Sequence, residues 1–213
     1  MTFALLALAA LTIAEPRSYD TCVALAETSA DEARLYADAW LAEGGNRPAR
    51  HCAAVAALAN GSAASAGAML ARLAEDEAVT PEVSARLYIQ SAEAFIDAGR
   101  EDQAFAALRA AYSAVPDAAE VHMAAAAIYA TAEEWQGVIL TIRALERHAN
   151  LSADAYALRG RAHFNRDELV EAALDASRAL AIDTLLVDAL VLRGDLAQAG
   201  VALPNDPFAP RKD

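Results

Sequence analysis

The stretch from Ala85 to Ala118 reads ARLYIQSAEAFIDAGREDQAFAALRAAYSAVPDA, and it decides the expected fold. Three of its positions, the eighth, the twentieth and the twenty-seventh, hold small residues: Ala92, Ala104 and Ala111. Larger apolar residues hold the fourth, eleventh and twenty-fourth positions: Tyr88, Phe95 and Leu108. Two apolar segments separated by a glycine therefore predict two helices packed closely against each other.

The same pattern repeats about every 34 residues, starting at Arg47, Ala85, Ala119, Ala153 and Val187. The eighth position of each repeat is small: Ala54, Ala92, Ala126, Gly160 and Gly194. Alanine is abundant in this chain, so the recurring aromatic residues and glycines are the stronger evidence for the period. The period predicts a fold built from stacked copies of one helical hairpin.

Composition agrees with an all-helical chain. Of the 213 residues 59 are alanine, the strongest helix former, while there are only seven prolines and nine glycines. The 30 acidic residues outnumber the 17 basic ones and give a net charge of −13. Because nucleic acid is a polyanion, this charge argues against a nucleic-acid partner.

The repeat resembles the tetratricopeptide repeat (TPR), in which two antiparallel helices, A and B, form one unit. The resemblance implies an all-α, right-handed solenoid of stacked hairpins with a C-terminal capping helix. We expect the solenoid to span residues 17–199. Its hairpins are expected at about 17–46, 47–80, 81–116, 117–150 and 151–183, followed by a cap helix at 185–199 and a disordered tail at 200–213.

Helix-capping patterns support these boundaries. Ser29 with Glu32, Thr131 with Glu134, and Asn165 with Glu168 have the spacing of a capping box at the start of expected B helices. Asp117 with Glu120, and Thr80 before Pro81, are expected to start A helices in a similar way.

The N-terminal segment 1–14 contains an uncharged apolar run of a length typical of a secretory signal, and too short to span a bilayer. A first helix packed on the fold is the alternative, but the run has no polar face. Export to the periplasm or cell envelope would permit a disulfide between Cys22 and Cys52. Two buried thiols in a cytoplasmic protein are the other interpretation.

No motif for catalysis, a cofactor or a metal occurs in the sequence. His122 and His163 fall at repeat positions that usually hold aromatic residues, so we expect them to be packed in the interior. We therefore predict a non-enzymatic protein with no cofactor.

The TPR resemblance places a ligand groove along the A helices. Its family positions predict these groove residues here: His51, Arg86, Ile89, Glu93, Asp97, Met123, Arg161, Phe164 and Asn165. Acidic residues outnumber basic ones in the wider groove set, which predicts a protein or peptide segment with basic or apolar side chains. The lysines that clamp chaperone tails in some family members are absent from these positions.

Two functions fit these expectations. One is a protein-binding scaffold of the bacterial cell envelope that holds a partner segment in the groove. The alternative is a structural subunit of a larger envelope complex that contacts its partners through its edges or its terminal helix.

Overall fold

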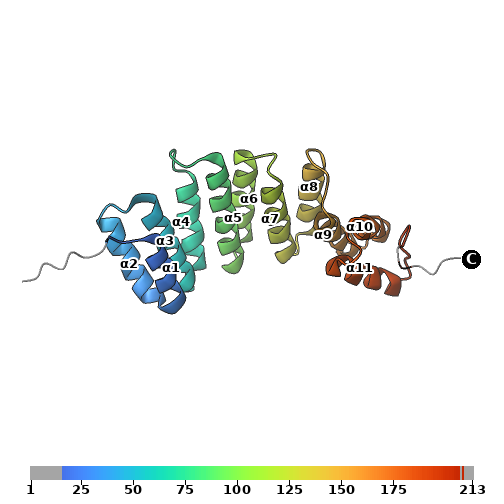
Figure 1. Cartoon of the computed structure of the whole chain (residues 1–213), viewed down its shortest axis with the longest axis horizontal. Coiled ribbons are helices and arrows are strands. Elements are labelled where there is room, and N and C mark those ends of the chain that lie inside the picture. Colours follow the sequence, from blue (N-terminus) through green and yellow to red (C-terminus); the bar gives the residue numbers. More distant parts are fainter. Residues whose placement is uncertain (1–15, 207, 209–213) are drawn as a thin grey trace, which may run out of the picture. The chain divides into compact units, whose positions relative to one another are not determined.

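The computed structural model describes residues 16–206 and 208, and this part of the chain contains eleven α-helices and no strand (Figure 1). The chain divides into two compact units, the first ending at Asn60 and the second beginning at Gly61. The predicted signal segment 1–14 lies outside the described residues. No helix in the described part combines the length and the hydrophobicity needed to cross a bilayer.

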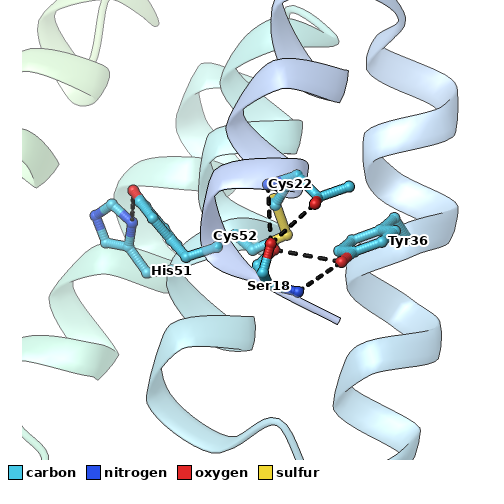
Figure 2. Close-up of a disulfide and its surroundings, with 7 residues drawn as sticks. Ser18, Cys22, Tyr36, His51 and Cys52 are labelled. Atoms are coloured by element: carbon cyan, nitrogen blue, oxygen red, sulfur yellow. Dashed lines mark hydrogen bonds between the residues drawn. A yellow bond between two sulfur atoms is a disulfide. The ribbon is translucent and has the colours of Figure 1, made fainter. Parts of the chain in front are cut away.

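The first unit contains three helices that pack against one another: α1 (Tyr19–Thr28), α2 (Ala30–Ala42) and α3 (Asn46–Ala59). Its interior includes Cys22, Ala37 and Cys52, with Trp40 packed against them. Cys22 of α1 and Cys52 of α3 form a disulfide with their Cα atoms 6.0 Å apart (Figure 2). This bond closes a separation of 30 residues between the first and third helices.

The second unit begins with α4 (Ala63–Ala74) and α5 (Pro81–Asp97), which pack together. Three further pairs of consecutive helices pack in the same way: α5 with α6 (Glu101–Ala114), α7 (Ala119–Thr131) with α8 (Trp135–Glu146), and α9 (Ala153–Asn165) with α10 (Leu169–Ile182). Helix α11 (Val187–Gln198) packs on α9 and α10. The two helices expected in hairpin 47–80 are divided between the units, α3 in the first and α4 in the second.

Small residues stand where helices of the second unit meet. Ala92, Ala104, Ala111, Ala126 and Ala172 are fully buried. A Cβ atom added to Gly160 would lie 2.8 Å from Cδ2 of Leu192 and 3.3 Å from the carbonyl oxygen of Ala172. Gly160 therefore lets α9 approach both α10 and α11 more closely than any side chain would permit.

The expected caps are confirmed at two helices. The hydroxyl of Ser29 accepts a hydrogen bond from the Glu32 amide at the start of α2. Thr80 caps α5 by accepting from the Val83 amide, with Pro81 at the first helical position.

The capping boxes predicted for α8 and α10 are wrong. Thr131 and Asn165 still belong to α7 and α9, and α8 and α10 begin after Glu134 and Glu168 without a side-chain cap. Left-handed residues close these turns instead, Glu133 at φ 57° and Asp167 at φ 61°. They occupy the place that Gly99 takes after α5, at φ 66°. In each case the amide of the next residue donates to the carbonyl oxygen five residues before it, which is the hydrogen bond of a Schellman turn.

The cap predicted at Asp117 is also wrong. Helix α7 begins at Ala119 after the uncapped residue Ala118, and Asp117 lies 3.2 Å from Nδ1 of His148 instead. Ser152, for which no cap was predicted, caps α9 by accepting from the Ala155 amide.

The disordered tail expected from residue 200 onward is corrected for the described residues 200–206. Leu203 is buried against α10 and α11, and the hydroxyl of Ser177 donates to the carbonyl oxygen of Pro204. The single Nε–H of Arg193 is shared between the two carboxylate oxygens of Asp206, at 2.9 and 3.0 Å. An apolar anchor and an ion pair thus hold a segment whose prolines and charges suggested disorder.

A buried ion pair replaces an apolar contact inside the second unit. Arg159, where the repeat pattern asks for leucine, donates to both carboxylate oxygens of Asp175 at 2.7 and 2.9 Å and to Glu146 at 2.8 Å. Arg159 and Asp175 are 4% and 2% exposed, so both charges lie in the interior. Burial alone would lower the pKa of Arg159, but its hydrogen bonds to Asp175 and Glu146 raise that pKa above its ordinary value.

We predict that Asp175→Ala lowers the free energy of unfolding by about 3–5 kcal/mol, because it leaves the buried Arg159 charge short of its main partner. The double variant Arg159→Met/Asp175→Leu should lose clearly less, since neither charge then remains buried. Urea denaturation followed by circular dichroism measures both effects.

Asp38→Ala is the matched control, because it breaks the exposed ion pair between Arg34 and Asp38 within α2. It should change the unfolding free energy by about 0.5 kcal/mol or less. An equally small effect of Asp175→Ala would contradict the role assigned to the buried pair.

Candidate functional site: a groove between A helices

Helices α5 and α7 pack side by side and enclose a groove. Its volume is about 340 Å³, and it is lined by Arg86, Ile89, Gln90 and Glu93 of α5 with Glu120, Val121 and Ala124 of α7. The α5 residues stand three or four apart and therefore share one face of that helix. The structure thus brings together Arg86, Ile89 and Glu93, three of the residues predicted from the repeat positions.

The groove has an apolar floor and a charged rim. Ile89 and Val121 are 8% and 3% exposed, so their side chains form a closed surface beneath the groove. Two carboxylates, Glu93 and Glu120, and one guanidinium, Arg86, stand along the rim. This arrangement offers apolar contact below and a net negative charge above.

The carboxyl of Glu93 lies in an unfavourable place for a negative charge. Partial burial raises its pKa above the ordinary value, and the nearby charge of Asp97 raises it further. A cation placed beside Glu93 would offset both effects. The groove therefore favours a positively charged side chain at this point.

The other predicted groove residues of the second unit have different surroundings. Asp97 is exposed near the end of α5 and acts on Glu93 by its charge. Met123 is half-buried and packs against the cluster that contains Val138 and Ile142. Neither residue lines the α5–α7 groove.

Helix α9 carries the remaining three predicted residues of this unit. Arg161 donates to Asp195 of α11 at 2.5 Å, one repeat length further along the chain, and its guanidinium lies over the ring of Phe164. Phe164 also packs against the interior between α9, α10 and α11. Asn165 is exposed as the last residue of α9. The charge of Arg161 is thus already balanced within the chain.

His51 belongs to the first unit. Its Nδ1 lies 2.9 Å from the hydroxyl of Tyr19, and the two rings are 5.5 Å apart beside the disulfide (Figure 2). This pairing ties the start of α1 to α3.

The repeat positions missed Gln90, Val121 and Ala124, which also line the groove. The spacing of Arg86, Gln90 and Glu93 along one face of α5 could have indicated the first of them. Whether Val121 and Ala124 face the groove depends on how α7 is rotated about its axis relative to α5. The spacing of residues in the sequence does not specify that rotation.

Both interior histidines follow the expectation. His122 and His163 are 5% and 3% exposed. Nε2 of His122 is 2.7 Å from the carbonyl oxygen of Pro116, and Nδ1 of His163 is 2.6 Å from Glu168. In the part of the chain that the structure covers, no group of three or more His, Cys, Asp or Glu side chains is placed to hold a metal ion.

Comparison with solved structures identifies the architecture. The structure of YrrB, described as a TPR protein with an unusual peptide-binding site, has a TM-score of 0.60 at 13% identity, over 83% of this chain and 90% of that one. The protein is TPR-like. The all-α TPR solenoid predicted from the sequence is thereby confirmed.

Two further TPR structures are similar. PilF of Pseudomonas aeruginosa has a TM-score of 0.53 at 14% identity, over 85% of this chain and 83% of that one. TTC0263 of Thermus thermophilus has a TM-score of 0.49 at 17% identity, over 85% of this chain and 98% of that one. Scans against protein-family models and curated proteins found no match. At these identities the likeness to YrrB and PilF establishes the fold and leaves the ligand to be argued from the groove.

We predict that Glu93 and Glu82, both on α5, titrate on opposite sides of the ordinary glutamate pKa. Backbone and side-chain hydrogen bonds lower the pKa of Glu82, whereas burial raises that of Glu93. Asp97→Asn should lower the pKa of Glu93, because it removes a like charge. NMR titration of the carboxyl carbons measures the pKa of Glu82, the pKa of Glu93, and the change in the Glu93 pKa in the Asp97→Asn variant.

The raised pKa also sets the sign of a stability effect. Ionised Glu93 disfavours folding above the ordinary glutamate pKa, so Glu93→Gln should stabilise the protein at neutral pH. That gain should vanish as the pH falls below about 4.3. A Glu93 pKa at or below that of Glu82 would contradict the electrostatic description of the groove.

Proposed function

We propose that this TPR-like protein is a non-catalytic scaffold that holds a segment of a partner protein in the α5–α7 groove. The observation that carries the proposal is the pairing of an apolar floor, Ile89 and Val121, with the rim carboxylates Glu93 and Glu120. A segment with alternating apolar and basic side chains complements both features. Apolar burial provides affinity, and the carboxylates select for positive charge.

The proposed location is the periplasm or cell envelope of a bacterium, with the cytoplasm as the alternative. The apolar segment 1–14 supports export, and the Cys22–Cys52 disulfide supports an oxidising compartment. The two lines of support are independent, because one concerns targeting and the other concerns redox chemistry.

A second candidate function is a structural subunit that contacts a complex through its terminal helix. It is favoured by aliphatic side chains on and beside α11 that are strongly exposed, namely Leu185 at 76%, Val187 at 67% and Val191 at 51%. Under this alternative, Val187→Asp with Val191→Asp would abolish assembly, whereas groove variants would leave assembly intact.

We predict that a fluorescent peptide of arginine and leucine binds the protein, and that Glu93→Arg weakens binding by about tenfold or more, because it places like charges together. Fluorescence anisotropy measures the affinity. A photo-crosslinking residue at position 86 or 93 should capture the peptide, whereas one at the exposed position Ala106 on α6 should not. Capture at Ala106 alone would refute the groove assignment.

We also predict that protein purified from its native host is cleaved near Ala14 and has no free thiol, as measured by intact mass before and after alkylation. Replacing Cys22 and Cys52 by alanine should lower the unfolding free energy of the first unit by about 3–4 kcal/mol, because the open loop gains conformational freedom when unfolded. Retention of Met1 with two free thiols would instead assign the protein to the cytoplasm.

A further inference from the structure

Helix α8 separates two concavities in the second unit. One, of about 410 Å³, is lined by residues of α6, α7 and α8, among them Tyr112, His122, Tyr129 and Leu140. The other, of about 200 Å³, is lined by residues of α8, α9 and α10, among them Arg143, Arg159 and Leu174. Between them, α8 presents Leu140, Arg143 and Ala144 on one face, and Arg147, the residue directly after the helix, continues that face at the same spacing of three or four. We call these four residues the α8 ridge.

The larger concavity is not part of the α5–α7 groove. On α7 the groove uses Glu120, Val121 and Ala124, whereas the concavity uses His122 and Tyr129. At about 100° per residue, these two sets fall on opposite sides of the helix. A ligand of the α8 ridge would therefore bind on another face of the unit from the groove ligand.

Aromatic rings fixed in position form the walls of the larger concavity. The ring of Tyr112 stacks on His122 with centroids 5.1 Å apart, and its hydroxyl lies 2.9 Å from that of Thr141. Tyr129 lies so close to Gly137 that a Cβ atom there would be 2.6 Å from the ring. Leu140 is 56% exposed at the edge. A preformed aromatic hollow of this size suits a bulky apolar side chain.

The charge of the α8 ridge is opposite to that of the chain as a whole. Arg143 and Arg147 are both exposed, and within the described residues neither forms an ion pair; a guanidinium nitrogen of Arg147 lies 3.5 Å from the carbonyl oxygen of Arg143. Of the neighbouring acids, Asp117 pairs with His148, Glu146 accepts from Arg159, and Glu171 lines the smaller concavity together with Arg143. In a chain with a net charge of −13, two exposed arginines beside an apolar hollow form a local site for negative charge.

We propose that the α8 ridge and its aromatic hollow form a second docking surface, which binds an acidic protein segment carrying a bulky apolar side chain. The apolar side chain enters the hollow between α6 and α8, and the acidic residues beside it pair with Arg143 and Arg147. The partner chemistry is the reverse of that expected for the α5–α7 groove, so the two faces of the unit select different segments.

The test uses three fluorescent probe peptides in anisotropy titrations: an acidic peptide of glutamate and phenylalanine, the same peptide with glutamine for glutamate, and the same with alanine for phenylalanine. We expect the first to bind and each replacement to weaken binding by about tenfold or more. Salt should weaken the first peptide most, because exposed charges are screened.

The decisive variant is Arg143→Glu/Arg147→Glu, expected to lose binding of the acidic peptide by at least about tenfold. The matched control is Arg72→Glu/Arg100→Glu, which makes the same change in net charge at two exposed arginines outside the ridge. The control and the groove variant Glu93→Arg should both retain binding. Circular dichroism checks that each variant is folded.

Amide chemical-shift changes on adding the acidic peptide should gather on α6 and α8. The proposal is overturned if the acidic apolar peptide fails to bind the wild-type protein, if the control variant loses as much affinity as the ridge variant, or if the shift changes gather on α5.

Discussion

Close approach of helix backbones is the constraint on which the rest of this structure depends. Gly160 makes it possible for α9, where a single added carbon would collide with Leu192 and approach the backbone of α10. Gly137 does the same beside the ring of Tyr129, and buried alanines do so at other contacts. Small contact residues bury little apolar surface each, so stability comes from many contacts repeated along the chain.

The period in the sequence predicted the helical architecture, and it placed part of the lining of the α5–α7 groove on one helix face, because both follow from residues that recur at fixed offsets. Arg86, Ile89 and Glu93 could be placed together for this reason. Glu133 and Asp167 could not be recognised as turn residues, since left-handed backbone is expected of glycine, which holds this repeat position at Gly61 and Gly99. The buried ion pair of Arg159 could not be predicted either. The repeat predicts leucine at this position, and the carboxylates that compensate the charge, Asp175 and Glu146, come from other helices.

Charge is arranged locally rather than by the net balance of the chain. The excess of acidic residues has the same sign as the rim of the α5–α7 groove, where Glu93 and Glu120 stand above an apolar floor. It failed to describe the α8 ridge, where Arg143 and Arg147 are exposed. The net charge is an average over all faces of the molecule, whereas each partner contacts only one face. Binding specificity therefore has to be assigned to each face separately.

The packed segment at residues 200–206 limits how the repeat array could grow. Leu203 and the pair of Arg193 with Asp206 cover part of the surface on α10 and α11 where the second helix of another hairpin would have to lie. Stacking a further helix on this surface would first require that segment to detach. A short stretch of chain with no regular structure therefore competes with any added helix for the same face of α10 and α11.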